Sequence, residues 1–125
     1  MAARQLSHKM SSRRAERVSE SVREALAELI LREVKDPRVV SVTITAVRVT
    51  NDLARAHVRF RCLGDEAAQV RCLAGLQSAT GFLRAQLLRR LQLRRAPQLS
   101  FEVDSSLPEL ERLAQAMHRA GERKE

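Results

Sequence analysis

Residues 65–91, DEAAQVRCLAGLQSATGFLRAQLLRRL, decide the fold, because they have the length of one long helix but carry two apolar stripes of different phase. The first stripe consists of Val70, Leu73 and Ala74. A second stripe, rotated by about 60°, fits the remainder better and consists of Thr80, Leu83, Leu87 and Leu91. Two interpretations fit this change of phase: the helix is interrupted at 79–81, where glycine tolerates a break, or it is continuous with one tolerated glycine.

The sequence on both sides of this segment predicts an α+β domain. An amphipathic helix is expected over 12–33, and it ends before Pro37, which cannot continue a helix. Alternation of apolar and polar residues predicts three strands, at 40–49, 54–62 and 99–103. The apolar phase of the first strand changes near Ala46, which predicts a β-bulge there.

At 125 residues, the chain has room for one domain. We expect a flexible N-terminal tail at 1–10, the domain at 11–105, and a C-terminal helix and tail at 106–125. The last helix is expected because Ser106 and Glu109 resemble a capping box. The predicted order is therefore helix, strand, strand, long helix, strand, with a three-stranded sheet packed against helices and a short C-terminal helix.

Charge and aromatic content constrain the partner. The net charge is +8, and the chain has no Trp, no Tyr and three Phe. Residues 67–101 contain six Arg and no Asp or Glu, which favours a polyanionic partner. Base stacking needs exposed aromatic rings that this chain hardly has, so nucleic-acid binding would depend on backbone groups and Arg.

The sequence argues against an enzyme, a metal site and a membrane protein. It has no nucleophile–base arrangement, no carboxylate cluster and no phosphate-binding glycine motif, so no catalytic residue and no cofactor are expected. Two Cys and three His are too few and too scattered for a metal site. Because no apolar run reaches 18 residues and the start does not resemble a secretory signal, we expect a cytoplasmic protein.

Three groups of arginines differ in their expected roles. The group near and after the glycine lacks acidic neighbours in the sequence and is the best candidate for a phosphate-binding surface; it consists of Arg84, Arg89, Arg90, Arg94 and Arg95. A helix that begins at a break also exposes N–H groups that attract anions. A second group opposes the dipole of the first helix, so that phosphate contact is one explanation; it consists of Arg13, Arg14 and Arg17. The solvent face of a strand explains Arg55, Arg59 and Arg61.

Five motifs, in order, resemble the ribosome-binding factor A family over about residues 10–105. They are Val34-Lys35-Asp36-Pro37-Arg38, Val42-Thr43-Ile44-Thr45, Asp52-Leu53-Ala54-Arg55-Ala56-His57-Val58, Leu63-Gly64-Asp65-Glu66 and Ala79-Thr80-Gly81-Phe82-Leu83-Arg84. The resemblance implies a fold like a type II KH domain. In this family an Ala-X-Gly kink, matched here by Ala79, Thr80 and Gly81, replaces the usual GXXG backbone clamp. The resemblance therefore favours the interrupted helix.

The resemblance also implies a function. It implies a non-catalytic bacterial assembly factor that binds the small (30S) ribosomal subunit, assists late 16S rRNA processing and is released with the help of a GTPase. We expect rRNA phosphates to contact the amides of the kink and the arginines near and after it, with Arg13, Arg14 and Arg17 at the periphery. A monomer is expected. Two alternatives are a nonspecific nucleoid DNA-binding protein and a protein-interaction adaptor whose arginines only maintain solubility.

Overall fold

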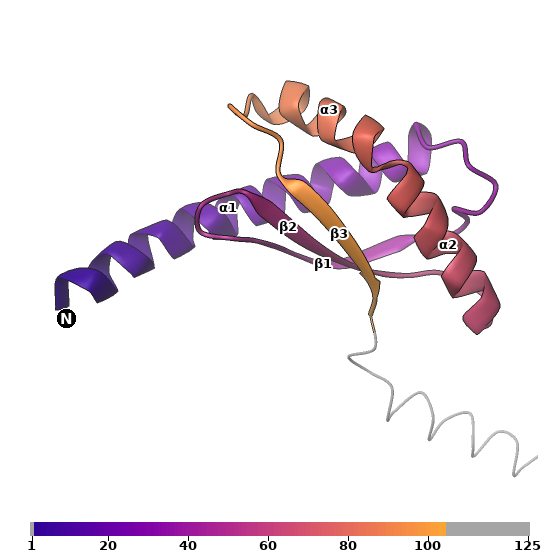
Figure 1. Ribbon diagram of the computed structural model, residues 1–125, viewed down its shortest axis with the longest axis horizontal. Coiled ribbons are helices and arrows are strands. Elements are labelled where there is room, and N and C mark those ends of the chain that lie inside the picture. The colour runs from indigo at the N-terminus through magenta and orange to yellow at the C-terminus, as the bar shows by residue number, and fades with distance from the viewer. Residues whose placement is uncertain (1, 105–125) are drawn as a thin grey trace, which may run out of the picture.

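The computed structural model describes residues 2–104, and within them three helices and three strands follow one another in the predicted order (Figure 1). The helices are α1 (Ala2–Arg32), α2 (Glu66–Ser78) and α3 (Thr80–Leu91). The strands are β1 (Thr43–Val49), β2 (Arg55–Arg61) and β3 (Gln98–Val103). No helix in this range is both long enough and apolar enough to span a membrane.

β2 is the central strand of the sheet. It pairs antiparallel with β1 and parallel with β3. The register between β1 and β2 shifts between Ile44 and Ala46, which confirms the predicted bulge. Because side chains alternate along a strand, the extra residue, Thr45, allows Ile44 and Val49 both to be buried despite their odd spacing.

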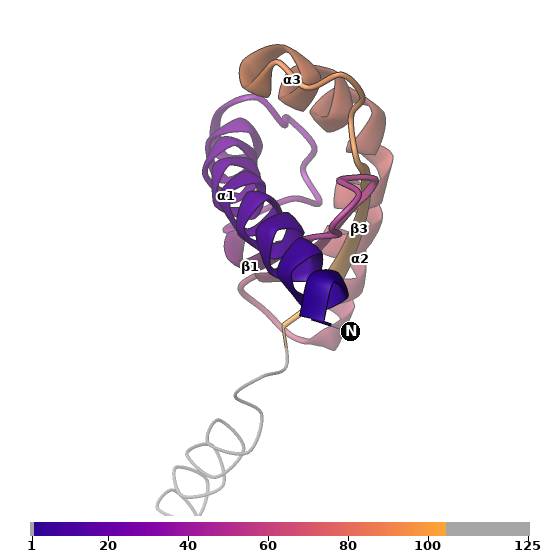
Figure 2. The ribbon, with the colours of Figure 1, turned by 90° about the vertical axis from the view of Figure 1, so that its left-hand side faces the viewer.

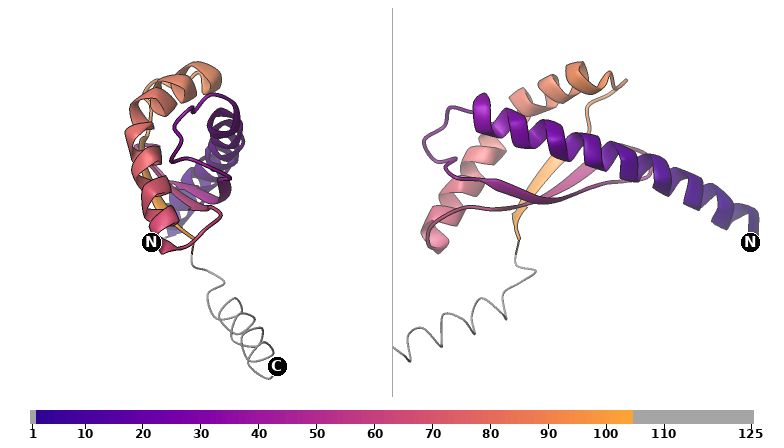
Figure 3. Two further views of the ribbon diagram at one scale, coloured as in Figure 1. Left: turned by 90° about the vertical axis from the view of Figure 1, so that its right-hand side faces the viewer. Right: turned by 180° about the vertical axis from the view of Figure 1, so that it is seen from behind.

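The helices cover one face of the sheet and leave the other open. Along β2, Ala56, Val58 and Phe60 are completely buried, whereas residues 55, 57 and 59 are exposed. Figure 2 shows α1 lying apart from α2 and α3, and Figure 3 shows α1 crossing the sheet. Leucines from all three helices complete the core, namely Leu26, Leu29, Leu76, Leu83 and Leu87.

Two predicted boundaries are wrong. α1 begins at Ala2, so residues 2–10, predicted as part of a tail, belong to the helix. β1 begins at Thr43 rather than at residue 40, because Ser41 has a left-handed φ of 53° that interrupts the extended chain. Val40 is accordingly 58% exposed. The C-terminal helix predicted at 106–125 lies outside the described residues.

The interruption between α2 and α3 confirms the predicted break. However, the change in phase of the apolar residues, from which the break was predicted, is wrong. Val70 is 66% exposed, and α2 instead buries Cys72, Gly75 and Leu76. Leu83 then follows Leu76 after seven residues, which keeps both on one face of a helix. The apolar pattern therefore does not require a break, and its cause lies in the local backbone.

Candidate nucleic-acid interface

Ala79 is the residue that separates α2 from α3. Its φ of −87° and ψ of −2° depart from the values of an α-helix. Its N–H lies 3.1 Å from both the Gly75 and the Leu76 carbonyl oxygens. The Thr80 hydroxyl donates to the Gln77 carbonyl oxygen at 2.8 Å, a local side-chain-to-backbone bond of the kind that often bends helices. The interruption therefore lies at Ala79 and Thr80.

Gly81 is not required by the geometry of the break. Among the described residues, Gly64 is the glycine with a positive φ. A Cβ added to Gly81 would meet no atom within 4 Å, and the residue is exposed in the first turn of α3. The backbone of the break therefore does not need the conformational freedom of glycine from which the break was predicted. Gly81 instead leaves bare backbone at the start of α3, where N–H groups lack helical partners.

We expect Gly81→Ala to stabilise the folded protein by up to about 1 kcal/mol, because alanine is the better helix former and its methyl group has open space. Urea unfolding followed by circular dichroism measures this change. If a ligand approaches the bare backbone, the same substitution weakens binding, so stability and affinity change in opposite directions. A destabilised variant would show that the break does need glycine.

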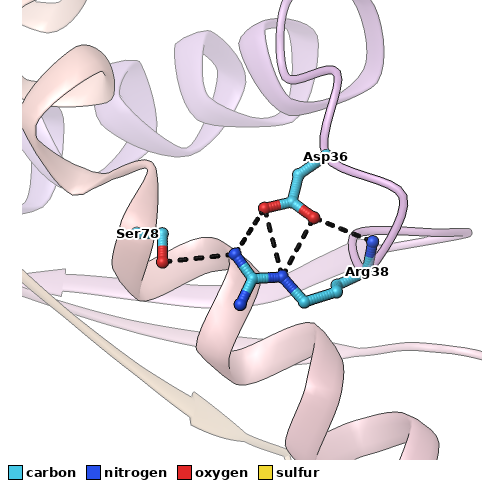
Figure 4. Close-up of polar contacts among 3 residues, drawn as sticks. All are labelled: Asp36, Arg38 and Ser78. Carbon is cyan, nitrogen blue, oxygen red and sulfur yellow. Dashed lines mark hydrogen bonds and ion pairs between the residues drawn. The ribbon is translucent and has the colours of Figure 1, made fainter.

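A loop held by Asp36 and Arg38 lies beside the break (Figure 4). Asp36 accepts a hydrogen bond from the Arg38 backbone N–H at 2.9 Å, and its Oδ2 lies 2.7 Å from the Arg38 Nη2. The same guanidinium donates to Ser78 Oγ at 3.3 Å, which ties the loop to the end of α2. The side-chain hydrogen bond from Arg38, followed by its backbone N–H, lowers the pKa of Asp36 to about 2. The carboxylate is therefore ionised at neutral pH.

Gly75 allows this loop to approach α2 closely. A Cβ at this position would lie 2.6 Å from Val39 Cγ2 and 3.2 Å from Arg38 Cβ. Both distances are shorter than an ordinary contact between carbon atoms. The absence of a side chain at Gly75 thus positions the loop that flanks the break.

The loop and the break border a shallow hollow of about 430 Å³ that is largely open to solvent, here called the break hollow. It is lined by Glu33, Val34, Lys35, Asp36, Pro37, Ser78, Ala79 and Phe82. Sequence reasoning misses Phe82, which is 42% exposed. Its exposure could have been predicted from its position, because this large apolar residue lies next to the glycine and outside the apolar stripe. That stripe consists of Thr80, Leu83, Leu87 and Leu91.

Three predicted arginines meet beyond the other end of α3. Arg14 of α1 lines a hollow of about 460 Å³ together with Arg94 and Arg95, and residues 51–54 and 92–93 complete it. We call this the arginine hollow. All three arginines are exposed. Gln92 has a left-handed φ of 50°, which ends α3 and redirects the chain before the two arginines.

Asp52 also lines the arginine hollow, but local groups hold its carboxylate. Its Oδ1 accepts hydrogen bonds from the Thr50 hydroxyl at 2.7 Å and from the Ala54 N–H at 3.1 Å. These bonds, the Thr50 one foremost, lower the pKa of Asp52. Three arginines and one locally bonded carboxylate thus line the hollow, so its lining has an excess of positive charge and is suited to an anion.

Two other predicted binding residues are engaged within the protein. Arg84 is half-buried and donates to the carbonyl oxygens of Ala96 and Pro97, both at 3.1 Å. It therefore supports the connector that carries the arginines at 94–95. Arg90 lies 3.3 Å from Glu28 of α1. The expectation that this arginine group lacks acidic partners is wrong for Arg90, because the acid comes from a distant part of the chain.

The predicted site residues form two regions rather than one. The break lies at the start of α3, whereas the arginines at 94–95 follow the end of α3. Because α3 has twelve residues, its two ends lie about 18 Å apart. Arg89 on α3 is exposed, as are Arg13 and Arg17 on α1. On the open face of the sheet, Arg59 is also exposed and pairs with Glu102 at 2.8 Å, as expected for a solvated strand face.

These features define a small α+β protein with a three-stranded sheet and an interrupted helix, consistent with the expected KH-like fold. A family model described as ribosome-binding factor A matches residues 14–117. The chain belongs to this family. Ribosome-binding factor A of Thiobacillus denitrificans is 51% identical over 94 residues, which cover 75% of this chain and 76% of the relative.

Solved structures of the same family share the fold. The crystal structure of ribosome-binding factor A from Thermus thermophilus matches with a TM-score of 0.64 and 31% identity, covering 71% of this chain and 93% of that one. A homology model of the Thermus thermophilus protein, fitted into the cryo-EM map of its complex with 30S, matches with a TM-score of 0.59 and 33% identity over the same shares of the two chains.

Proposed function

We propose that this protein binds the small ribosomal subunit through 16S rRNA and assists late rRNA maturation without catalysing a reaction. Membership of the ribosome-binding factor A family supports this function, as does the fit of a related protein into a map of a 30S complex. The observation that carries the proposal is the meeting of Arg14, Arg94 and Arg95 at one hollow. Guanidinium groups bind phosphates in a bidentate geometry, so this hollow suits the RNA backbone.

The protein would act through binding free energy alone. Phosphates occupy the arginine hollow, while the bare backbone at Gly81 offers a second contact. Because α3 separates these two regions, they contact different nucleotides and together stabilise one conformation of immature rRNA. We further propose that the protein is a cytoplasmic monomer, and the family resemblance implies that a GTPase helps to release it.

Co-sedimentation with separated small subunits, large subunits and intact ribosomes tests this function. We expect the protein to sediment with free small subunits, and crosslinking then identifies the contacted rRNA. Sedimentation with chromosomal DNA instead would favour a nonspecific nucleoid protein. Binding that neither rRNA nor added salt competes with would favour a protein-interaction adaptor, because phosphate contacts are salt-dependent.

We expect the double variant Arg94→Ala/Arg95→Ala to bind small subunits more weakly and with less salt dependence. Each lost phosphate contact lowers the slope of log affinity against log salt by about 0.7 to 0.9. The matched control is Arg48→Ala/Arg71→Ala, which removes the same charge from exposed positions outside both hollows. An unchanged slope in the first variant, or an equal change in the control, would remove the arginine hollow from the interface.

A further inference from the structure

Phe82 differs from the other two phenylalanines in its surroundings. Phe60 and Phe101 are 0% and 7% exposed and belong to the core, whereas Phe82 is 42% exposed. It lines the break hollow, and two of its neighbours there, Ala79 and Pro37, are apolar. A partly exposed aromatic ring beside an apolar lining is the arrangement on which unstacked nucleic-acid bases bind.

Side-chain hydrogen bonds hold the walls of the break hollow together. Its two walls are joined because the Arg38 guanidinium bonds to both Asp36 and Ser78 (Figure 4). The hollow has a volume of about 430 Å³ and is shallow and largely open to solvent, so that a ligand lying in it keeps one face exposed. A flat ligand can therefore enter without a large rearrangement of the loop.

We propose that the break hollow holds one unpaired nucleobase stacked on Phe82. This proposal rests on the proposed function, since it assumes that RNA is the partner. A base fits the hollow better than a phosphate does, because Lys35 only offsets the carboxylates of Glu33 and Asp36 and leaves the lining without an excess of positive charge. A base is neutral and presents a π-face to the ring.

The surroundings of the hollow suit the backbone that carries such a base. At Gly81, next to Phe82, an added Cβ would meet no atom within 4 Å, so a sugar–phosphate has room to pass. Lys35 is exposed and also lines the hollow, which places an ammonium group within reach of the adjoining phosphate. Although the chain has few aromatic residues, one exposed ring is enough to stack one base.

A tryptophan at position 82 provides a direct test, because the chain has no other Trp and no Tyr. The full-length Phe82→Trp variant is titrated with single-stranded RNA decamers and, in parallel, with an abasic ribose–phosphate decamer of equal charge. Stacking predicts that the base-containing RNA quenches the tryptophan fluorescence and that the abasic strand does not. Equal quenching by both strands, or none by either, would overturn the proposal.

Binding of the Phe82→Leu and Phe82→Trp variants to small subunits provides the second measurement. Leucine keeps apolar bulk but removes the ring, so we expect affinity to fall by about 5- to 150-fold, the equivalent of about 1 to 3 kcal/mol. Tryptophan restores it. Val70→Ala, at a 66% exposed apolar position on α2, is the control and should bind normally. Circular dichroism and thermal melting verify that each variant is folded.

The outcomes separate this inference from the proposed function. If Phe82→Leu binds as the unaltered protein does while Arg94→Ala/Arg95→Ala binds weakly, stacking is overturned and the proposed function stands. If Phe82→Leu weakens subunit binding but RNA does not quench Phe82→Trp, the hollow contacts a ribosomal protein and the base is excluded. If the unaltered protein binds no small subunit, the proposed function fails and the inference with it.

Discussion

Gly75→Val is expected to destabilise the folded protein by about 3 kcal/mol, the upper end of the usual range for overpacking. The added Cβ would lie 2.6 Å from Val39 Cγ2 and 3.2 Å from Arg38 Cβ. Val39 has a short, β-branched side chain that is stiff at χ1, and Arg38 Cβ is attached directly to the backbone, so the loop itself must move away from α2. Urea unfolding followed by circular dichroism measures the loss, because the chain lacks Trp and Tyr as fluorescent probes.

Gly81→Ala is the matched control, because the same residue type is replaced in the same pair of helices but at a position with open space. The two variants should therefore change stability in opposite directions. Movement of the loop in Gly75→Val also displaces the contact between Arg38 and Ser78, which forms one side of the break hollow. A variant that unfolds at the same urea concentration as the unaltered protein would contradict this account of the packing.

Arg84→Met is expected to destabilise the protein by about 2 to 3 kcal/mol. This is less than the sum for two hydrogen bonds from a charged donor, at about 1.5 to 3 kcal/mol each, because Arg84 is only half-buried and solvent weakens its bonds. Two such bonds, to the carbonyl oxygens of Ala96 and Pro97, are lost. Methionine keeps the bulk of the aliphatic stem. Arg89→Met, at an exposed position on the same helix, should stay within about 0.5 kcal/mol of the unaltered protein.

Arg84→Lys distinguishes the supporting role of Arg84 from direct phosphate binding. Lysine retains the charge but lacks the planar fork that reaches two carbonyl groups at once. If Arg84 positions the connector at 94–97, the lysine variant loses stability and binds small subunits less well. Normal stability and normal binding in that variant would instead indicate that only the charge matters.

The order of elements could be predicted from the sequence because it depends on local patterns. Alternation along β2 predicts its buried and exposed faces, and the change of phase in β1 predicts the bulge. The helix break is a different case. The interruption at Ala79 agrees with the family resemblance, but the apolar stripe that suggested it included the exposed Val70. A one-dimensional stripe cannot show which face of an interrupted helix the sheet covers.

The candidate site was harder to predict, because its contacts join residues that are distant in the sequence. Arg90 has no acidic neighbour along the chain, but the fold places Glu28 of α1 beside it. The two acceptors of Arg84 are main-chain carbonyls, which no residue type reveals. Phe82 could not be identified from composition, because the number of phenylalanines, three, does not say which one is exposed.

The position of β3 in the chain sets the order in which the protein can assemble. β3 is the last element of the described range, and its parallel pairing with β2 requires a crossover connection, which α2 and α3 supply. The arginine hollow likewise joins Arg14 of α1 to Arg94 and Arg95, which come far later in the sequence. Long-range pairings of this kind are slow to form. A nascent chain that stops short of residue 94 therefore has α1 and the β1–β2 hairpin but no assembled arginine hollow.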